Sequence, residues 1–231
     1  MTARKAEFGT GALFKAAGTV QGVMIVGGLL VATNILLVVS PLLVGVIGPV
    51  ALLPLLLTGP SVVAACYAFN RLVAGEDTGV FRDFLGSYRN NFGQALVVGL
   101  PYLGVLAVIC ANLLSLPGSN PETVAARAGL LGLGILMGTA AAHALLLLSR
   151  FTFRTVDIHR LAAYSLGAHK RVSLGNAGIL FVTGFVLLST TAWLMLFVVG
   201  LVVYLLCLNS RPLLRLVERR FTTAREPQPA G

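Results

Sequence analysis

Charged side chains are missing from four long segments of this chain, and apolar residues fill these segments. Asp, Glu, Lys and Arg are all absent from residues 16–70, 90–121, 128–149 and 172–210, which hold 55, 32, 22 and 39 residues. Because a helix needs about 20 apolar residues to cross the hydrocarbon core of a bilayer, these lengths correspond to roughly two, one, one and two crossings. The pattern predicts an all-α fold, a polytopic transmembrane bundle of about six helices.

The expected crossings form a single transmembrane domain over residues 19–210. It lies between a cytoplasmic amino-terminal segment, 1–18, and a basic cytoplasmic tail, 211–231. We place the crossings near 19–39, 58–74, 95–115, 129–149, 172–189 and 192–210. The last two require a tight reversal near Ser189, and a five-helix version with one long final helix remains an alternative.

Residues 41–57 are apolar, but prolines and glycines interrupt them. An irregular backbone is tolerated at membrane depth only where other protein segments cover it. We therefore expect a re-entrant or outer-face segment here rather than a seventh crossing.

Basic residues predict the orientation of the bundle, because cytoplasmic connections are rich in Lys and Arg. With the amino terminus inside, 16 of the 17 Lys and Arg residues fall on cytoplasmic segments, and only Arg127 falls outside. A crossing by residues 41–57 would move residues 71–89 and 150–171 to the outer face, against this bias. The sequence therefore predicts that both termini are cytoplasmic.

The composition agrees with a membrane protein. Hydrophobic residues make up 57% of the chain and charged residues 11%, and the mean hydropathy is +0.90, outside the range of ordinary soluble domains. Basic connections account for the net charge of +9, so we expect the lipid bilayer and no nucleic acid as a partner. Three cysteines at unrelated spacings predict neither a disulfide framework nor a zinc site.

Two connections have the pattern of amphipathic helices at the inner membrane surface. In residues 78–92 an aromatic stripe faces away from charged and amide side chains. The candidate docking residues of this segment are Phe81, Arg82, Asp83, Phe84, Tyr88, Arg89, Asn90 and Phe92. In residues 157–171, Ile158, Leu161, Ala162, Ser165 and Leu166 form an apolar stripe beside Arg160, His169, Lys170 and Arg171. Each helix is either an interfacial anchor or a docking surface for a partner protein.

Few polar groups lie within the expected crossings. The candidate intramembrane polar residues are Asn34, Asn112 and His143, which either line a pathway or bond to a neighbouring helix. Small residues recur every four positions at Gly134, Gly138 and Ala142, a spacing typical of close helix packing.

No group of residues has the pattern of a catalytic site. An intramembrane enzyme needs a nucleophile, an acid–base pair or a metal cluster near the bilayer. The titratable groupings at Glu76-Asp77 and at Asp157 and His159 lie in polar connections instead. We therefore expect no enzymatic activity, no catalytic or metal-binding residue and no cofactor.

Residues 34–37 and 59–96 resemble the YesL family of bacterial integral membrane proteins, which is named for a domain of unknown function. The resemblance rests on Gly59-Pro60 at the start of the second helix, on the segment 81–84, Phe-Arg-Asp-Phe, and on the segment 89–92, Arg-Asn-Asn-Phe. It implies a multi-pass protein of the bacterial cytoplasmic membrane. It also implies an accessory or regulatory role in carbohydrate uptake, with subunits of an ABC transporter as partners.

The alternative function is a small channel or facilitator for neutral solutes. For this function the polar residues inside the crossings would have to line a pathway. No residue pattern indicates an oligomeric state.

Overall fold

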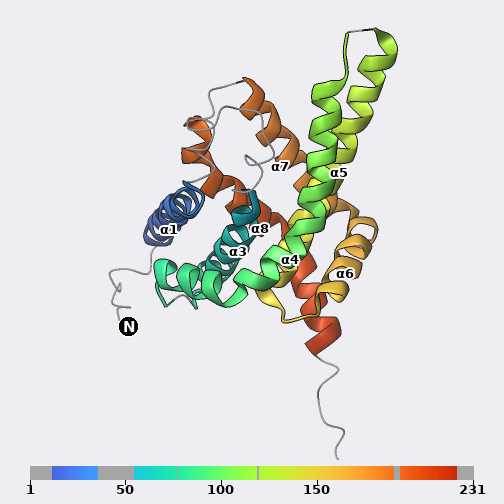
Figure 1. The fold of residues 1–231 in the computed structure, drawn as a ribbon. Helices are drawn as coiled ribbons and strands as arrows, with labels where there is room; N and C mark the ends of the chain where they lie inside the picture. Colours follow the sequence, from blue (N-terminus) through green and yellow to red (C-terminus); the bar gives the residue numbers. More distant parts are fainter. Residues whose placement is uncertain (1–11, 36–54, 77, 119, 190–192, 223–231) are drawn as a thin grey trace, which may run out of the picture.

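The computed structural model describes residues 12–35, 55–76, 78–118, 120–189 and 193–222. Within these ranges the chain forms helices and no β-strand, and Figure 1 shows how the helices are arranged. The seven helices are α1 (Ala12–Thr33), α3 (Thr58–Ala74), α4 (Val80–Ser115), α5 (Pro121–Arg150), α6 (Thr155–Ala168), α7 (Lys170–Ser189) and α8 (Trp193–Thr222). The all-α prediction is confirmed.

Five helical segments are long and apolar enough to cross a membrane. They are Ala16–Thr33, Leu55–Ala74, Val80–Ser115, Pro121–Arg150 and Val198–Glu218. The remaining expected crossing, 172–189, falls on α7. Because α7 ends at Ser189 and α8 begins at Trp193 and packs against it, the alternative of one long final helix is wrong.

Of the apolar segment 41–57, residues 41–54 lie outside the described residues.

Helix α4 differs from the expectation of a separate surface helix followed by a crossing. Residues 80–115 form a single helix of 36 residues, about 54 Å long at 1.5 Å per residue. In Figure 1 its first part lies across the lower end of the bundle and the rest rises steeply. The helix contains Pro101 and several glycines, residues at which helices bend without ending. The segment 78–92 is therefore continuous with the crossing that follows it.

Helix α5 begins earlier than the expected 129. The Asn120 side chain accepts a hydrogen bond from the Thr123 backbone N–H at 3.2 Å, and Pro121 occupies the first helical position. The Arg127 guanidinium donates to the Leu116 carbonyl at the end of α4, 2.7 Å away. Helices α4 and α5 thus form a long hairpin that extends beyond the other helices (Figure 1).

Two neighbouring clusters of buried side chains form the core. One contains Val26 of α1, Phe69 of α3 and Phe84 of α4. The other joins α5, α6 and α8 through Leu147, Ile158 and Leu213 among others. Helix α8 contributes to both clusters, so it connects the two halves of the bundle.

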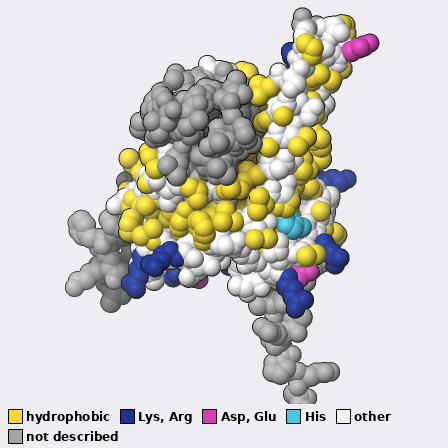
Figure 2. Space-filling view, in the orientation of Figure 1, with side chains coloured by type: hydrophobic (Ala, Val, Ile, Leu, Met, Phe, Trp, Pro, Cys, Tyr) yellow, Lys and Arg dark blue, Asp and Glu magenta, His cyan; other side chains and the backbone are white. Residues whose placement is uncertain are grey.

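Most basic residues of the described helices collect at one end, which we call the basic end, whereas Arg127 lies near the opposite end of α5. The end of α3, the start of α4, the end of α5, the start of α7 and the end of α8 meet there. Arg150 at the end of α5 lies 3.3 Å from Glu218 near the end of α8. Figure 2 shows most Lys and Arg side chains of the visible face toward the lower end of the molecule, with apolar side chains above them.

Candidate docking site at the basic end

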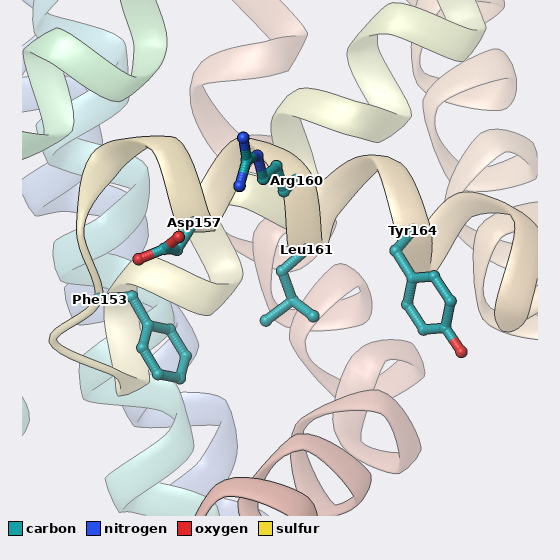
Figure 3. Close-up of a pocket in the computed structure, with 5 residues that line it drawn as sticks. All are labelled: Phe153, Asp157, Arg160, Leu161 and Tyr164. Carbon is teal, nitrogen blue, oxygen red and sulfur yellow. The ribbon is translucent and has the colours of Figure 1, made fainter.

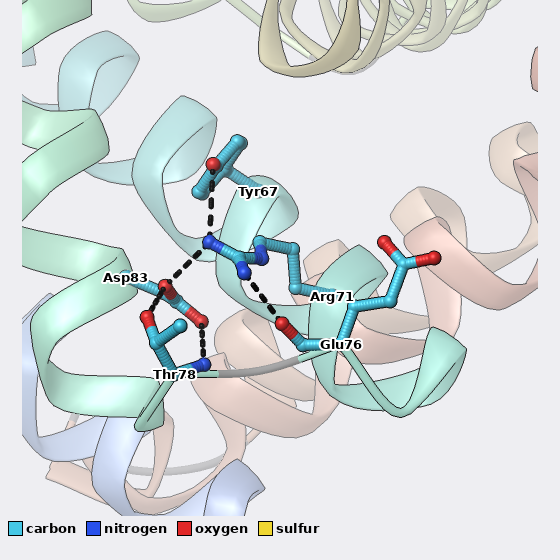
Figure 4. Close-up of polar contacts among 5 residues, drawn as sticks. All are labelled: Tyr67, Arg71, Glu76, Thr78 and Asp83. Carbon is cyan, nitrogen blue, oxygen red and sulfur yellow. Dashed lines mark hydrogen bonds and ion pairs between the residues drawn. The ribbon is translucent and has the colours of Figure 1, made fainter.

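A polar cluster joins the end of α3 to the first turn of α4 (Figure 4). Nη1 of Arg71 lies 3.0 Å from Oδ1 of Asp83 and 3.5 Å from the Tyr67 hydroxyl. Nη2 of Arg71 donates to the Glu76 carbonyl. Asp83 also accepts hydrogen bonds from the backbone N–H of Thr78 at 3.2 Å and from its hydroxyl at 2.7 Å. The cluster therefore fixes where α4 begins and how it is rotated.

The burial of Asp83 corrects the sequence analysis, which placed this residue on the polar face of a surface helix. Its side chain is only 3% exposed, whereas that of Arg71 is 29% exposed. A carboxylate is stable in such a position because the Arg71 guanidinium and two neutral donors of Thr78 bond to it, and because the first turn of a helix favours negative charge.

The aromatic residues of the segment also divide between the interior and the surface. Phe84 is fully buried in the core, and Tyr88 stacks on it with ring centroids 6.2 Å apart. Phe92 contacts Tyr88 edge to face at 5.5 Å, and both rings are partly buried. Phe81, in contrast, is 56% exposed.

Five side chains at the start of α4 are thus exposed; four of them are candidate residues, and the fifth, Leu85, was not among the candidates. Four of these exposed residues lie on one side of the helix: Phe81, Arg82, Leu85 and Arg89. Asn90 is also exposed and lies beside them. We call these five residues the α4 docking face. Asp83 and Phe84 orient this face from inside and do not belong to it.

Helix α6 presents a second surface at the same end. Its expected apolar stripe packs inward, since Ile158, Ala162 and Ser165 are buried. On the outer side Phe153, Asp157, Arg160, Leu161 and Tyr164 line a shallow pocket of about 460 Å³ (Figure 3). The segment before α6 is held to α4, because the Gln94 side chain donates to the Phe153 carbonyl at 2.7 Å.

His143 is fully buried between helices. Its Nδ1 lies 2.8 Å from the hydroxyl of Ser165 in α6, and that hydroxyl donates to the Ala162 carbonyl at 2.7 Å. Nε2 of His143 is buried and has no hydrogen-bond partner among the described residues. His143 is therefore a packed residue that joins α5 to α6.

The other two intramembrane candidates lie apart from His143. The side-chain amide of Asn34, directly after α1, donates to the Leu30 carbonyl of α1, 2.8 Å away. Asn112 is exposed, and its amide donates to the Val108 carbonyl at 2.8 Å. Within the described part of the chain, no hydrogen bond connects any two of these three residues.

The small residues of α5 contact two different helices. A Cβ atom added to Gly134 would lie 3.8 Å from Ile109 of α4, and one added to Gly138 would lie 3.5 Å from Leu180 of α7. Both are ordinary contacts with side chains, and Ala142 is half-buried. A tighter contact with a backbone lies elsewhere: a Cβ atom added to Gly200 of α8 would lie 2.8 Å from the Cα of Gly27 in α1.

A buried amide cluster between α7 and α8 was not among the candidates. The Asn176 amide donates to the Ser210 hydroxyl at 2.9 Å. The Asn209 amide donates to the Asn176 side-chain oxygen at 2.8 Å and to the Val172 carbonyl at 2.9 Å. Both asparagines lie in the charge-free segment 172–210, a signal that could have identified them. Among the described residues, no three His, Cys, Asp or Glu side chains are grouped so that they could hold a metal ion.

Comparison with known proteins gave one family match. A family model described as "Protein of unknown function, DUF624" matches residues 30–113. The matched segment includes α3, nearly all of α4, the Arg71–Asp83 cluster and the α4 docking face. Neither the search of curated proteins nor the search of solved structures returned a match. The chain therefore carries a DUF624 region over residues 30–113, and the resemblance to the YesL-like membrane proteins fits this match, because those proteins carry the same region.

Proposed function

We propose that this protein is a non-catalytic accessory or regulatory component of a carbohydrate ABC-type uptake system in the bacterial cytoplasmic membrane. In this proposal the protein binds a transporter subunit through the α4 docking face. The family resemblance suggests the kind of partner, and the surface at the start of α4 suggests where that partner binds.

The observation that carries the proposal is the contrast between neighbouring residues of α4. Counted over whole residues rather than side chains alone, Phe81 is 56% exposed, whereas Asp83 and Phe84 are 4% and 0% exposed. The buried pair anchors the helix, and the exposed residues are presented in a fixed orientation. A preorganised surface loses little conformational entropy when a partner binds.

The chemistry of the face indicates the kind of surface it would recognise. Arg82 and Arg89 are exposed and have no ion-pair partner among the described residues. Phe81 and Leu85 provide apolar area beside them. Aromatic and arginine side chains are frequent at the energetic centres of protein interfaces, so the expected partner surface combines carboxylates with apolar side chains.

The buried polar groups also favour an accessory role over a transport pathway. His143 bonds to Ser165, and Asn176 bonds to Ser210 and Asn209. These contacts join helices to one another. Such hydrogen bonds stabilise helix association in membranes.

The test is co-purification of the tagged full chain from native membranes in a mild detergent. We expect ABC-type sugar transporter subunits to be recovered, and the double substitution Arg82→Glu and Arg89→Glu to reduce their recovery roughly tenfold through charge repulsion. The matched control reverses Arg154 and Arg171, two exposed arginines at the same end, and should leave recovery unchanged.

Two results would contradict the proposal. One is unchanged recovery of the transporter subunits after reversal of Arg82 and Arg89. The other is rapid flux of neutral sugars through the purified protein in liposomes, which would favour the alternative of a small channel or facilitator.

A further inference from the structure

One face of α8 remains uncovered along much of the helix. Five residues spaced three or four positions apart lie on the same side of this helix: Leu201, Leu205, Leu208, Pro212 and Arg215. Leu201 is 45% exposed and Leu205 41% exposed. The opposite side of α8, which includes Leu206, Leu213 and Val217, is buried in the bundle.

The first half of this face forms one wall of a groove between α7 and α8. The groove has a volume of about 460 Å³, and its walls include Ile179 and Val182 of α7 and Leu201 and Leu205 of α8. Its one hydroxyl group among the lining side chains, that of Thr183, donates to the Ile179 carbonyl at 2.7 Å. The groove therefore offers an apolar ligand contacts but no free hydrogen-bonding side chain.

The second half of the face is basic. It contains a hollow of about 570 Å³, which is lined by Leu208, Arg211, Pro212, Arg215 and Leu216. Arg211 and Arg215 are one helical turn apart, and neither has an ion-pair partner within the described ranges. The carboxylate of Glu218, also on α8, pairs with Arg150. Two guanidinium groups thus face outward at the basic end, next to the apolar groove.

We propose that an anionic phospholipid of the bilayer binds along this face of α8. Its acyl chain lies in the groove between α7 and α8, and its phosphate accepts hydrogen bonds from Arg211 and Arg215. Guanidinium groups bind phosphate oxygens strongly, and basic residues at the membrane surface attract anionic lipids.

The dimensions fit one lipid molecule. Leu205 and Arg211 are six residues apart on α8, about 9 Å along the helix axis at 1.5 Å per residue. This is less than the ~15 Å depth of hydrocarbon in one leaflet. A single phospholipid therefore reaches both the arginines and the groove. This site is separate from the α4 docking face, so it does not depend on the proposed function.

The test titrates the full chain in a non-ionic detergent with dioleoyl phosphatidylglycerol and measures the bound fraction by native mass spectrometry. We expect the double substitution Arg211→Gln and Arg215→Gln to weaken binding about thirtyfold, the equivalent of about 2 kcal/mol for two basic residues. The matched control, Arg154→Gln with Arg160→Gln, removes two charges at the same end and should change binding less than threefold, roughly the loss of nonspecific attraction.

The apolar part of the site has its own pair of variants. A Cβ atom at Gly178 or at Gly184 would meet no atom within 4 Å apart from its own stretch of helix, so both positions of α7 accept a larger side chain. Gly178 lines the groove and Gly184 does not. Gly178→Phe should fill the groove and weaken lipid binding, whereas Gly184→Phe should not.

Two further ligands separate a bilayer lipid from other sources of the same chemistry. Glycerol phosphate, a headgroup without acyl chains, should not displace the lipid at equal concentration, and phosphatidylcholine should bind more weakly than phosphatidylglycerol. Equal binding of the two lipids, displacement by glycerol phosphate, or unchanged binding by the Arg211 and Arg215 variant would overturn the proposal.

Discussion

The guanidinium of Arg71 lies 3.0 Å from the buried carboxylate of Asp83, although the two residues are on different helices and 12 positions apart. The pair connects the end of α3 to the first turn of α4. Since Asp83 faces inward, the exposed residues Phe81, Arg82 and Arg89 face outward. The ion pair and the buried Phe84 together thus orient the side chains of this segment that a partner can reach.

Loss of the Asp83 carboxylate should destabilise the start of α4. Asp83→Ala removes the acceptor of the Thr78 and Arg71 hydrogen bonds, and we expect the free energy of unfolding to fall by about 2 kcal/mol. Glu122→Ala is the control, because Glu122 is also acidic and in a first helical turn but is exposed. Denaturation in mixed micelles measures both variants, and equal stability of the two would contradict the structural role of Asp83.

The crossing of α1 and α8 should tolerate a methyl group on one side only. A Cβ atom at Gly200 would lie 2.8 Å from the Gly27 Cα and 2.8 Å from the Val23 carbonyl oxygen. A Cβ atom at Gly27 would lie 3.6 Å from its nearest neighbour. We therefore expect Gly200→Ala to destabilise the protein by about 1–3 kcal/mol, and Gly27→Ala to be nearly neutral. Thermal unfolding in detergent checks this asymmetry, and a reversed order would show that the helices cross differently.

Ser165 should contribute to stability mainly through His143. Ser165→Ala leaves both nitrogens of a buried imidazole without a partner, and we expect a loss of about 1–3 kcal/mol. Ser149 is the matched control, because it is also buried but donates only to the Leu146 carbonyl in its own helix. Ser149→Ala should therefore cost less. A double-mutant cycle of Ser165→Ala with His143→Leu measures the coupling directly, and additive effects would exclude the proposed contact.

The membrane helices were predictable because charge is costly in lipid. Four charge-free segments were enough to predict an all-α membrane protein. The same criterion placed the helix ends wrongly. Helices α4 and α5 extend past the charge-free segments, because Arg82, Arg89 and Glu122 are compatible with a helix even though they lie outside the expected crossings. In α4 and α5 the charge-free segment therefore marks only part of the helix.

The individual contacts were harder to predict. An amphipathic pattern assigns Asp83 to the polar side of α4. It does not show that this carboxylate is buried and paired with Arg71 of α3. The approach of Gly27 to Gly200 has the same origin, because each glycine acquires its role only when α1 and α8 meet. The packing of His143 against Ser165 likewise depends on the position of α6. Sequence patterns within one helix identify candidates, and the partner helix determines what each candidate does.

The most direct test of the membrane topology is labelling of single cysteines with a membrane-impermeant maleimide. Ala163 is exposed on α6 at the basic end, and Glu122 is exposed at the opposite end of α5. The background carries Cys110→Ala, since Cys66 and Cys207 are buried. We predict that Glu122→Cys reacts in intact cells and that Ala163→Cys reacts only after the membrane is permeabilised. Labelling of Ala163→Cys in intact cells would contradict a cytoplasmic basic end.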